Sequence, residues 1–227
     1  MKITYIHHSS FSVELENAVL LFDYFKGTLP EFPAGKPLFI FASHFHADHY
    51  DPVIFQLGEK RENVFYILSK EIGKKIPEEY RKRYKDRIRL VKAGERFCLN
   101  ISEESLIVET FHSTDEGVAF WLSCEGKEIY RAGDLNNWWW EGEDMAWNRN
   151  MAASYKQEMK KLSGRTADLA FIPVDPRLEQ WFYLGAAGFM EQADTKWIFP
   201  MHFWEDYTII PKLIEHPSSE GWRDRIV

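Results

Sequence analysis

The stretch FASHFHADHYDP, residues Phe41–Pro52, contains three histidines and one aspartate within six consecutive residues. It continues the apolar run that begins at Leu38, and a short run of this kind predicts a buried strand. Asp51 and Pro52 have the residue types of a helix N-cap and a first helical position. The histidine-rich segment is therefore expected on the loop that joins a strand to a helix.

Four side chains of this loop are of the kinds that bind transition metals. His44 and His46 can turn toward one point, while Asp48 and His49 can turn toward a second point nearby. Imidazole nitrogens and carboxylate oxygens are the ligands that zinc, manganese and iron take from proteins. The loop therefore predicts part of a metal site.

Further ligand-type residues follow apolar runs later in the chain, namely His112 after LIVETF, Asp134 after EIYRAG and His202 after KWIFPM. A single histidine after a strand is more often a surface or core residue. A window that matches HxHxDH, however, arises by chance only on the order of once in a million. Because all these positions lie where a strand meets a loop, one sheet edge can gather them into a site for two metal ions.

The remaining sequence predicts strands first and then strands alternating with helices, twice over. This order is typical of the α/β class with helices covering a pair of packed sheets. No domain boundary is visible, so residues 1–227 are expected to form one domain. The predicted strands are a hairpin over Ile3–Phe25, Leu38–Ala42, Val64–Leu68, Ile88–Val91, Leu106–Thr110, a hairpin over Val118–Tyr130, Leu169–Val174 and Lys196–Pro200, with helices after Asp51, over Asn148–Leu162 and over Ala186–Gln192.

Composition restricts the classes of function. The net charge is −7, so the chain gains nothing from counterion release and no nucleic-acid partner is expected. The sequence contains no run of 18 apolar residues, so no membrane insertion is expected. The N-terminal sequence lacks the features of a signal peptide. Cys98 and Cys124 are isolated in the sequence, which favours buried free thiols in a cytoplasmic protein.

The motif SHFHADH resembles the HxHxDH signature of the metallo-β-lactamase superfamily. The opening ITYIHHSSFSVELENAVLLFDYF resembles the start of that family, and the later order His112, Asp134, His202 resembles the order of its remaining ligands. The tripeptide Ala132–Asp134 is similar to the branch that includes ascorbate-6-phosphate lactonase-like and N-acylphosphatidylethanolamine phospholipase-like hydrolases. Relatives there often have histidine before this tripeptide, where the present chain has Arg131. The resemblance implies a four-layer αββα sandwich of two packed mixed β-sheets with helices on the outer faces.

The same resemblance implies two divalent metal ions per chain, with zinc favoured and manganese or iron as the alternatives. One metal would be held by His44, His46 and His112, the other by Asp48, His49 and His202, and Asp134 would bridge them. The implied chemistry is attack by a metal-bound hydroxide, with Asp48 and Asp134 as catalytic carboxylates. Asp23 would accept a hydrogen bond from the other N–H of a ligating imidazole, or it would be a plain turn residue.

Several residues are expected around the metals. The segment LNNWWWEGEDMAW (Leu135–Trp147) has four tryptophans and follows Asp134 directly. We expect it to form a small core and to wall the pocket, with Asn136 and one or more of Trp138, Trp139 and Trp140 near the mouth. Arg177 suits an anionic substrate group or an ion pair with Asp175 or Glu179. His8 resembles a histidine that relatives keep near the site entrance.

These observations predict a metal-dependent hydrolase that acts on a small ester, lactone or phosphodiester, with anionic or phosphorylated substrates favoured. A nuclease of the RNA-processing branch is the first alternative and would use the basic run Tyr80–Arg89 as a clamp. A solvated helix or loop face explains that run better in an acidic chain. A non-catalytic metal-binding sensor or scaffold is the second alternative. Exposed aromatic residues are compatible with a homo-oligomer.

Overall fold

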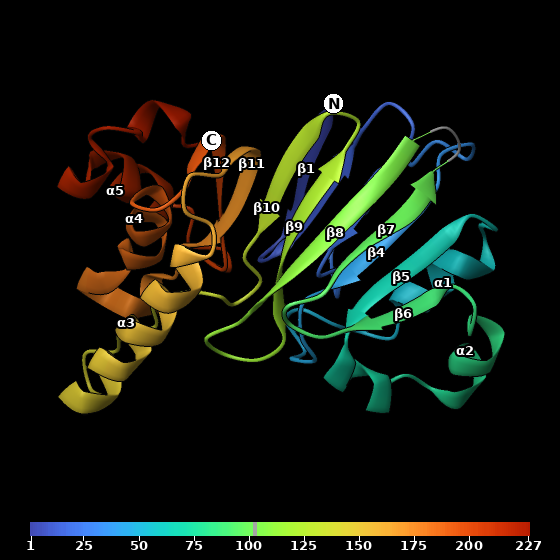
Figure 1. Cartoon of the computed structure of the whole chain (residues 1–227), viewed down its shortest axis with the longest axis horizontal. Helices are drawn as coiled ribbons and strands as arrows, with labels where there is room; N and C mark the ends of the chain where they lie inside the picture. The colour runs from blue at the N-terminus through green and yellow to red at the C-terminus, as the bar shows by residue number, and fades with distance from the viewer. Residues whose placement is uncertain (102–103) are drawn as a thin grey trace.

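Two six-stranded sheets pack face to face in the computed structural model, which describes residues 1–101 and 104–227 (Figure 1). The first sheet, in spatial order, contains β1 (Lys2–His7), β2 (Ser10–Glu14), β3 (Val19–Phe22), β4 (Leu38–Ala42), β5 (Val64–Ser69) and β6 (Ile88–Val91). The second contains β12 (Asp194–Met201), β11 (Thr166–Pro173), β10 (Lys127–Arg131), β9 (Val118–Cys124), β8 (Glu104–His112) and β7 (Arg96–Ile101). Both sheets are mixed, because antiparallel pairs at one side give way to parallel pairs at the other.

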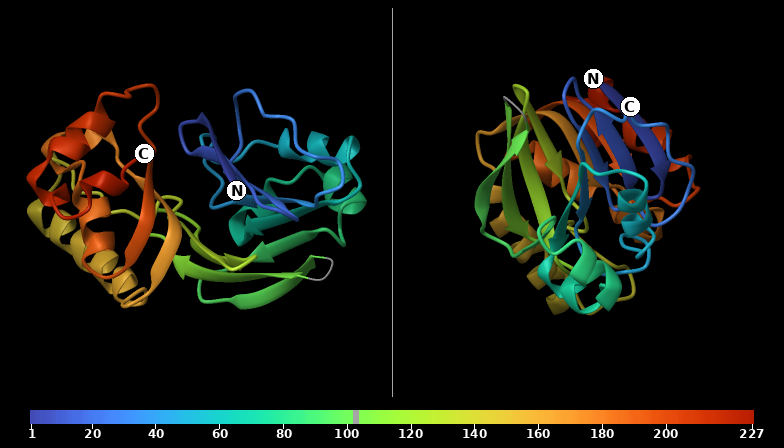
Figure 2. Two further views of the ribbon diagram at one scale, coloured as in Figure 1. Left: turned by 90° about the horizontal axis from the view of Figure 1, so that it is seen from above. Right: turned by 90° about the vertical axis from the view of Figure 1, so that its right-hand side faces the viewer.

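Helices cover the outer faces of both sheets (Figure 2). The first sheet carries α1 (Ile54–Glu59) and α2 (Glu78–Arg83), and the second carries α3 (Met145–Lys160), α4 (Leu184–Met190) and α5 (Ile209–Glu215). Phe55 of α1 packs against Tyr66 of β5 with tilted rings, and Phe189 of α4 stacks on Tyr130 of β10 with ring centroids 4.8 Å apart. The predicted four-layer αββα sandwich is therefore confirmed.

Strand β4 shows why the apolar run before the histidine cluster is continuous. Phe39 and Phe41 belong to the core between the sheets, where the ring of Phe41 lies 5.3 Å from that of Phe120 in the second sheet. Leu38, Ile40 and Ala42 face the core beneath the helices. Because successive side chains of a strand point to opposite faces, a strand buried on both faces must be apolar throughout.

The observed elements differ from the predicted ones mainly at edges and termini. The predicted hairpin over Ile3–Phe25 consists of the three strands β1, β2 and β3, and the edge strand β7 and helices α2 and α5 were not predicted. The basic run Tyr80–Arg89 covers most of α2 and enters β6. Its tyrosines pack inward on Phe55, whereas most of its basic side chains are exposed. This arrangement is a solvated face with an aromatic underside.

The two cysteines lie in different environments. Cys124 is buried at the end of β9, whereas Cys98 is exposed on the edge strand β7, so the expectation that both are buried was wrong for Cys98. An edge strand packs against a neighbour on one side only, which leaves such positions open to solvent. Within the two described ranges, no helix is both long and apolar enough to cross a membrane.

Candidate metal centre

The predicted ligand residues follow strands whose carboxyl ends meet at one edge of the two sheets. Asp23 follows β3, the histidine-rich loop follows β4, Asp134 lies just after β10, and His202 follows β12. In parallel sheets the carboxyl ends of neighbouring strands share an edge, where ligands commonly bind. The β3–β4 and β11–β12 pairs are parallel, so each sheet delivers its share of the ligands to the same place.

Within the described residues, two groups of side chains bring their ligand atoms together, with all atoms of a group within 4.8 Å of one another. Both contain histidines and carboxylates, as a transition-metal site requires. One group is His44, His46, Asp115 and Asp134, and the other is His8, Asp48, His49 and His202. The structure thus gathers every predicted ligand except His112, and it adds His8 and Asp115.

Asp134 lies between the two groups. Its Oδ2 is 3.7 Å from Nε2 of His44 in the first group and 3.3 Å from Nε2 of His202 in the second. Its Oδ1 is 3.1 Å from Nε2 of His49. A carboxylate placed in this way can contact both metals of a pair, as expected from the sequence.

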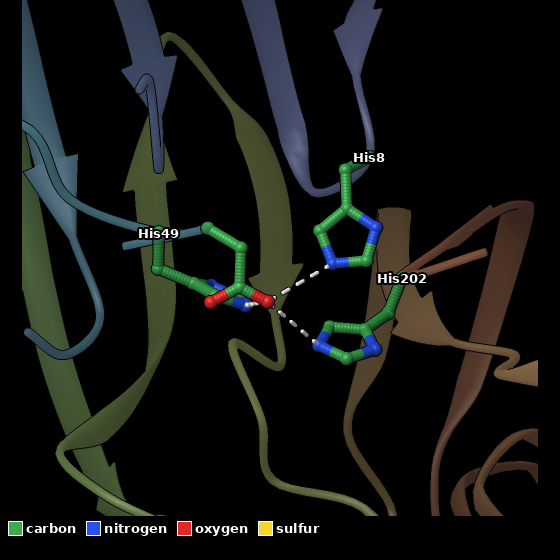
Figure 3. Close-up of side chains that lie close together, drawn as sticks. His8, His49 and His202 are labelled. Atoms are coloured by element: carbon green, nitrogen blue, oxygen red, sulfur yellow. Dashed lines mark ion pairs between the residues drawn. The ribbon is translucent and has the colours of Figure 1, made fainter. Parts of the chain in front are cut away.

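Asp48 is the centre of the second group. Its Oδ2 lies 3.3 Å from Nε2 of His8, 3.7 Å from Nε2 of His202 and 3.9 Å from Nε2 of His49. Figure 3 shows the rings of His8, His49 and His202 converging from three separate segments of the chain. Asp48 also lines the cavity in front of the site, so it faces both the ligand group and the space for a substrate.

His112 does not reach the site, and Asp115 occupies the place expected for it. Oδ2 of Asp115 lies 3.4 Å from Nδ1 of His46. His112 pairs with Val118 in the β8–β9 register, and its neighbour Phe111 points into the core. Because strand side chains alternate, His112 points to the opposite face, where it is exposed. The loop after β8, rather than the strand itself, delivers the carboxylate.

The buried atoms of the site fit a metal centre. His44 Nε2, His49 Nε2 and Asp134 Oδ1 are buried and make no hydrogen bond with any described residue. A buried polar atom without a partner costs free energy, about 1–3 kcal/mol for a typical group. Several such atoms facing one another are explained if metal ions complete their bonding.

The opposite sides of the imidazole rings are held by the protein. Nδ1 of His49 lies 3.1 Å from Asp23, Nδ1 of His202 lies 2.9 Å from Asp175, and Nδ1 of His44 lies 3.0 Å from the Ser43 hydroxyl. Such partners fix the orientation of a ligating ring and leave Nε2 for the metal. These contacts also give Asp23 the supporting role that the sequence analysis allowed.

Asp23 is part of a fully buried network that includes Arg131. The carboxylate accepts hydrogen bonds from the Ser43 amide at 2.7 Å and from the Arg131 guanidinium at 2.7 Å. Burial opposes ionisation of Asp23, but Arg131 and His49 outweigh it and hold the pKa of the carboxyl well below its usual range. Arg131 also bonds to the carbonyl of Ser9 and lies against Met201, so it ties both sheets to the site.

The histidines divide into two electrostatic classes. Burial lowers the pKa of His8 to about 4 and that of His44 to about 3, so both are neutral at pH 7. Burial also opposes charge on His49 and His202. The carboxylate of Asp134 outweighs it and raises the pKa of His49 to about 10 and that of His202 to about 9. In the metal-free protein these two rings therefore hold protons that a metal must displace.

A cavity of about 350 Å³ opens in front of the metal centre, lined by His46, Asp48, Asp134, Trp138, Trp140 and Arg177 among others. Trp138 both belongs to the core and walls this cavity, and its indole stacks nearly parallel to that of Trp140. Trp139 packs instead against Trp181. Asn136 is fully buried rather than at the mouth, with its amide against Gly185.

Arg177 forms the ion pair with Asp175 that the sequence analysis considered, and it also lines the cavity. Its guanidinium binds Asp175 through Nε at 3.0 Å and Nη2 at 2.6 Å, and Asp175 in turn accepts from His202. The side chain is still about half exposed, at 52%, and it lines the cavity. Arg177 thus links the cavity surface to a metal-ligand candidate.

Local sequence signals for His8 and Asp115 were present but weak. Asp115 is an acid on the loop that follows β8, and its one local signal is that it lies three residues after His112. His8 follows β1 at a backbone position with φ 51°, which L-residues seldom adopt. No periodicity reports such a position, so only the structure could place His8 in the ligand group.

Comparisons with known proteins agree with this architecture. The sequence model of the family described as "Beta-lactamase superfamily domain" matches residues 2–202. No curated protein matches the chain. Among solved structures, a protein of Parabacteroides distasonis named as a metal-dependent hydrolase is 20% identical, with a TM-score of 0.65 over 99% of this chain and 90% of its own.

Two further structures share the fold. Igni18, a metallo hydrolase from the archaeon Ignicoccus hospitalis, is 17% identical, with a TM-score of 0.63 over 99% of this chain and 93% of its own. CmlA, a diiron β-hydroxylase from Streptomyces venezuelae, is 12% identical, with a TM-score of 0.58 over 96% of this chain and 51% of its own. One fold thus accompanies different reactions, so the site itself has to indicate the chemistry.

Proposed function

The chain belongs to the beta-lactamase superfamily, and we propose that it is a binuclear metal-dependent hydrolase of a small ester, lactone or phosphodiester. The observation that carries this proposal is the pair of adjacent ligand groups with Asp134 between them. Its support is the set of buried nitrogen and oxygen atoms that lack protein partners. The similar proteins of P. distasonis and I. hospitalis are also named as hydrolases that depend on metal.

In this proposal His44, His46 and Asp115 hold one metal, while Asp48, His49 and His202 hold the other, and Asp134 contacts both. Two bound divalent ions would lower the pKa of a coordinated water and stabilise negative charge that develops on the substrate. Zinc is our first choice because imidazole and carboxylate suit it, with manganese and iron as alternatives. The similarity to a diiron protein keeps iron among them.

Asp48 and Asp134 are the proposed catalytic carboxylates. Burial opposes ionisation of Asp48, but His8 and its neighbours outweigh it and hold its pKa well below the usual range. Burial likewise opposes ionisation of Asp134, yet His202 and His49 hold its pKa far below the usual range. Both groups are therefore ionised at neutral pH. Asp48 lines the cavity, so it is placed to orient the attacking water and to accept its proton.

The proposed substrate is small and carries an anionic group such as phosphate or carboxylate. The guanidinium of Arg177 lines the cavity, and a guanidinium suits bidentate oxyanions. Trp138 and Trp140 supply apolar walls. A second cavity of about 480 Å³ along α3 shares Thr114, Asp115, Trp147 and Met151 with the first and gives room for a longer substrate.

The test is the metal content of protein purified without a chelator or a histidine tag, measured by plasma mass spectrometry. About two transition-metal ions per chain, followed by hydrolysis in a screen of lactones, phosphodiesters and phosphorylated sugars, is the expected result. His49→Ala should lose both metal and activity while the protein remains folded. No bound metal, and no uptake of added zinc or manganese, would contradict the proposal.

The nuclease alternative has less support. In the basic run, Arg81 donates to the carbonyl of Gly73 at 2.6 Å, Arg83 pairs with Glu59 and Arg89 lies near Glu95. These local partners favour a solvated face over a clamp for RNA. If the protein binds two metals but hydrolyses none of the screened substrates, that result would favour the non-catalytic sensor or scaffold.

A further inference from the structure

His8 lies among the candidate ligands, but its ring is held differently from theirs. Nδ1 of His8 is 3.0 Å from the backbone nitrogen of Trp204, 196 residues further along the chain. A backbone N–H can only donate, so this Nδ1 must offer a lone pair. The single proton of the neutral ring then resides on Nε2, which is the nitrogen that faces the site.

The rings of His49 and His202 have the opposite arrangement. Their Nδ1 atoms face the carboxylates of Asp23 at 3.1 Å and Asp175 at 2.9 Å. An ionised carboxylate only accepts, so these Nδ1 atoms carry the protons, and a neutral ring then presents the Nε2 lone pair that a metal needs. His8 thus presents a proton at Nε2, whereas the neutral rings of His49 and His202 present a lone pair there.

The backbone around His8 maintains this arrangement. His8, His202 and Trp204 have φ angles of 51°, 65° and 53°, a region that non-glycine residues occupy mainly where the surroundings impose it. The amide of His202 donates to the carbonyl of His8 at 3.3 Å. The indole of Trp204 stacks on the imidazole with ring centroids 4.0 Å apart. Turning the ring by 180° would place a carbon where Nδ1 now accepts the Trp204 amide, and so it would break that hydrogen bond.

We infer that His8 is not a metal ligand but a positioning residue that directs its Nε2–H at the carboxylate of Asp48. Oδ2 of Asp48 lies 3.3 Å from this Nε2, which makes no hydrogen bond with any other described group. His8 is fully buried and does not line the cavity, so it acts through Asp48 rather than on the substrate. The same Oδ2 also faces Nε2 of His202 and His49, so the hydrogen bond from His8 orients the oxygen that points at the metal site.

This inference rests on the proposed function, because it assigns roles around the same metal pair. It keeps the second metal with the two imidazoles of His49 and His202, although His8 lies in the same group of side chains. Partners that orient a ligating carboxylate typically affect activity or metal affinity by about 10–100-fold when they are removed. His8 is therefore expected to influence turnover without changing the number of metals.

The first test is the tautomer of His8, read from long-range ¹H–¹⁵N correlation spectra of the ¹⁵N-labelled protein. In both the metal-free and the zinc-loaded protein, Nε2 of His8 should carry the proton and Nδ1 should not. In the zinc-loaded protein, His49 and His202 should show protonated Nδ1 and metal-bound Nε2. An Nε2 of His8 that loses its proton when zinc binds would overturn the inference.

The second test compares two amide variants of His8. His8→Gln keeps an N–H donor near the position of Nε2, whereas His8→Asn is too short to reach Asp48 and tolerates the left-handed backbone well. Both should retain two metals per chain. Hydrolysis of bis(p-nitrophenyl) phosphate should show a kcat lowered about 10–100-fold in His8→Asn, with most of the loss restored in His8→Gln.

Loss of one metal per chain in His8→Asn, as expected for His49→Ala, would overturn the inference. Equal kcat values for His8→Asn and the natural protein would overturn it as well. If the natural protein binds no metal, that result contradicts the proposed function, and the spectrum of the metal-free protein alone decides the tautomer of His8.

Discussion

Oδ2 of Asp115 lies 3.4 Å from Nδ1 of His46, while His112, three residues earlier, is exposed on the other side of its strand. The contact joins the loop after β8 to the loop after β4, and so it joins the two sheets at the metal centre. The carboxylate of Asp115, rather than the imidazole of His112, therefore belongs to the group that contains His44 and His46.

Replacing Asp115 with alanine should therefore reduce the metal content from about two ions per chain to about one, because the first group loses a ligand. His112→Ala is the matched control on the same segment and should leave both metals bound. Metal content measured after equilibration with limiting zinc distinguishes the two variants. Loss of metal in His112→Ala with none in Asp115→Ala would contradict this assignment.

Arg131→Met should destabilise the metal-free protein by about 3–5 kcal/mol, because it leaves the buried charge of Asp23 without its guanidinium partner. Arg165→Met is the control, since its ion pair with Glu109 is partly exposed and should contribute less than about 1 kcal/mol. Urea unfolding at pH 7 measures both changes. Similar losses in the two variants would show that the Arg131–Asp23 pair has no special structural role.

Metal binding should release protons at neutral pH. His49 and His202 have pKa values raised to about 10 and about 9 in the metal-free protein, so both rings are protonated at pH 7 and must lose a proton to bind metal. His44, whose pKa burial lowers to about 3, contributes none. Metal affinity should therefore rise with pH from 6 toward 9 and fall as the pH is lowered.

Calorimetric titration with zinc at pH 7, in buffers of different ionisation enthalpy, gives the number of protons released. We expect about two per chain from these rings, and fewer in His202→Ala. Release of no protons would mean that the two rings are already neutral before the metal binds.

Trp140→Ala should raise KM several-fold with little change in metal content, because this indole lines the cavity without belonging to a ligand group. Trp139→Ala is the control within the same segment, since its ring packs on Trp181 instead. Steady-state kinetics on whichever substrate the screen identifies would separate them. Identical kinetics for Trp140→Ala and the natural protein would place that ring outside the substrate-binding surface.

Arg177→Ala should raise KM for phosphorylated or carboxylated substrates by about tenfold, in proportion to the loss of one charge-assisted hydrogen bond of about 1.5 kcal/mol. Neutral esters should be affected much less. Because Arg177 also binds Asp175, a loss common to all substrates would indicate that the variant acts by disturbing His202. That outcome would rule out a role in anion recognition.

The sequence by itself determined the layered fold and most of the ligand set. An apolar run buried on both faces makes β4 an interior strand, and it ends at Ala42, so the HxHxDH loop has to emerge at the carboxyl edge of a sheet. Asp134 and His202 occupy corresponding places after β10 and β12. Local periodicity is sufficient to place these residues at strand ends, whereas their assignment to two metals came from the resemblance to the metallo-β-lactamase superfamily.

Only the tertiary structure decided the choice between His112 and Asp115 and the role of His8. Loop residues follow no period, so the approach of Asp115 to His46 depends on how two sheets pack. The hydrogen bond from Trp204 to His8 joins residues 196 positions apart, and it decides which nitrogen of the ring carries the proton. The sequence specifies which side chains are present. The position of the proton on His8 and the geometry of the ligand groups depend on contacts that form only when distant segments of the chain meet.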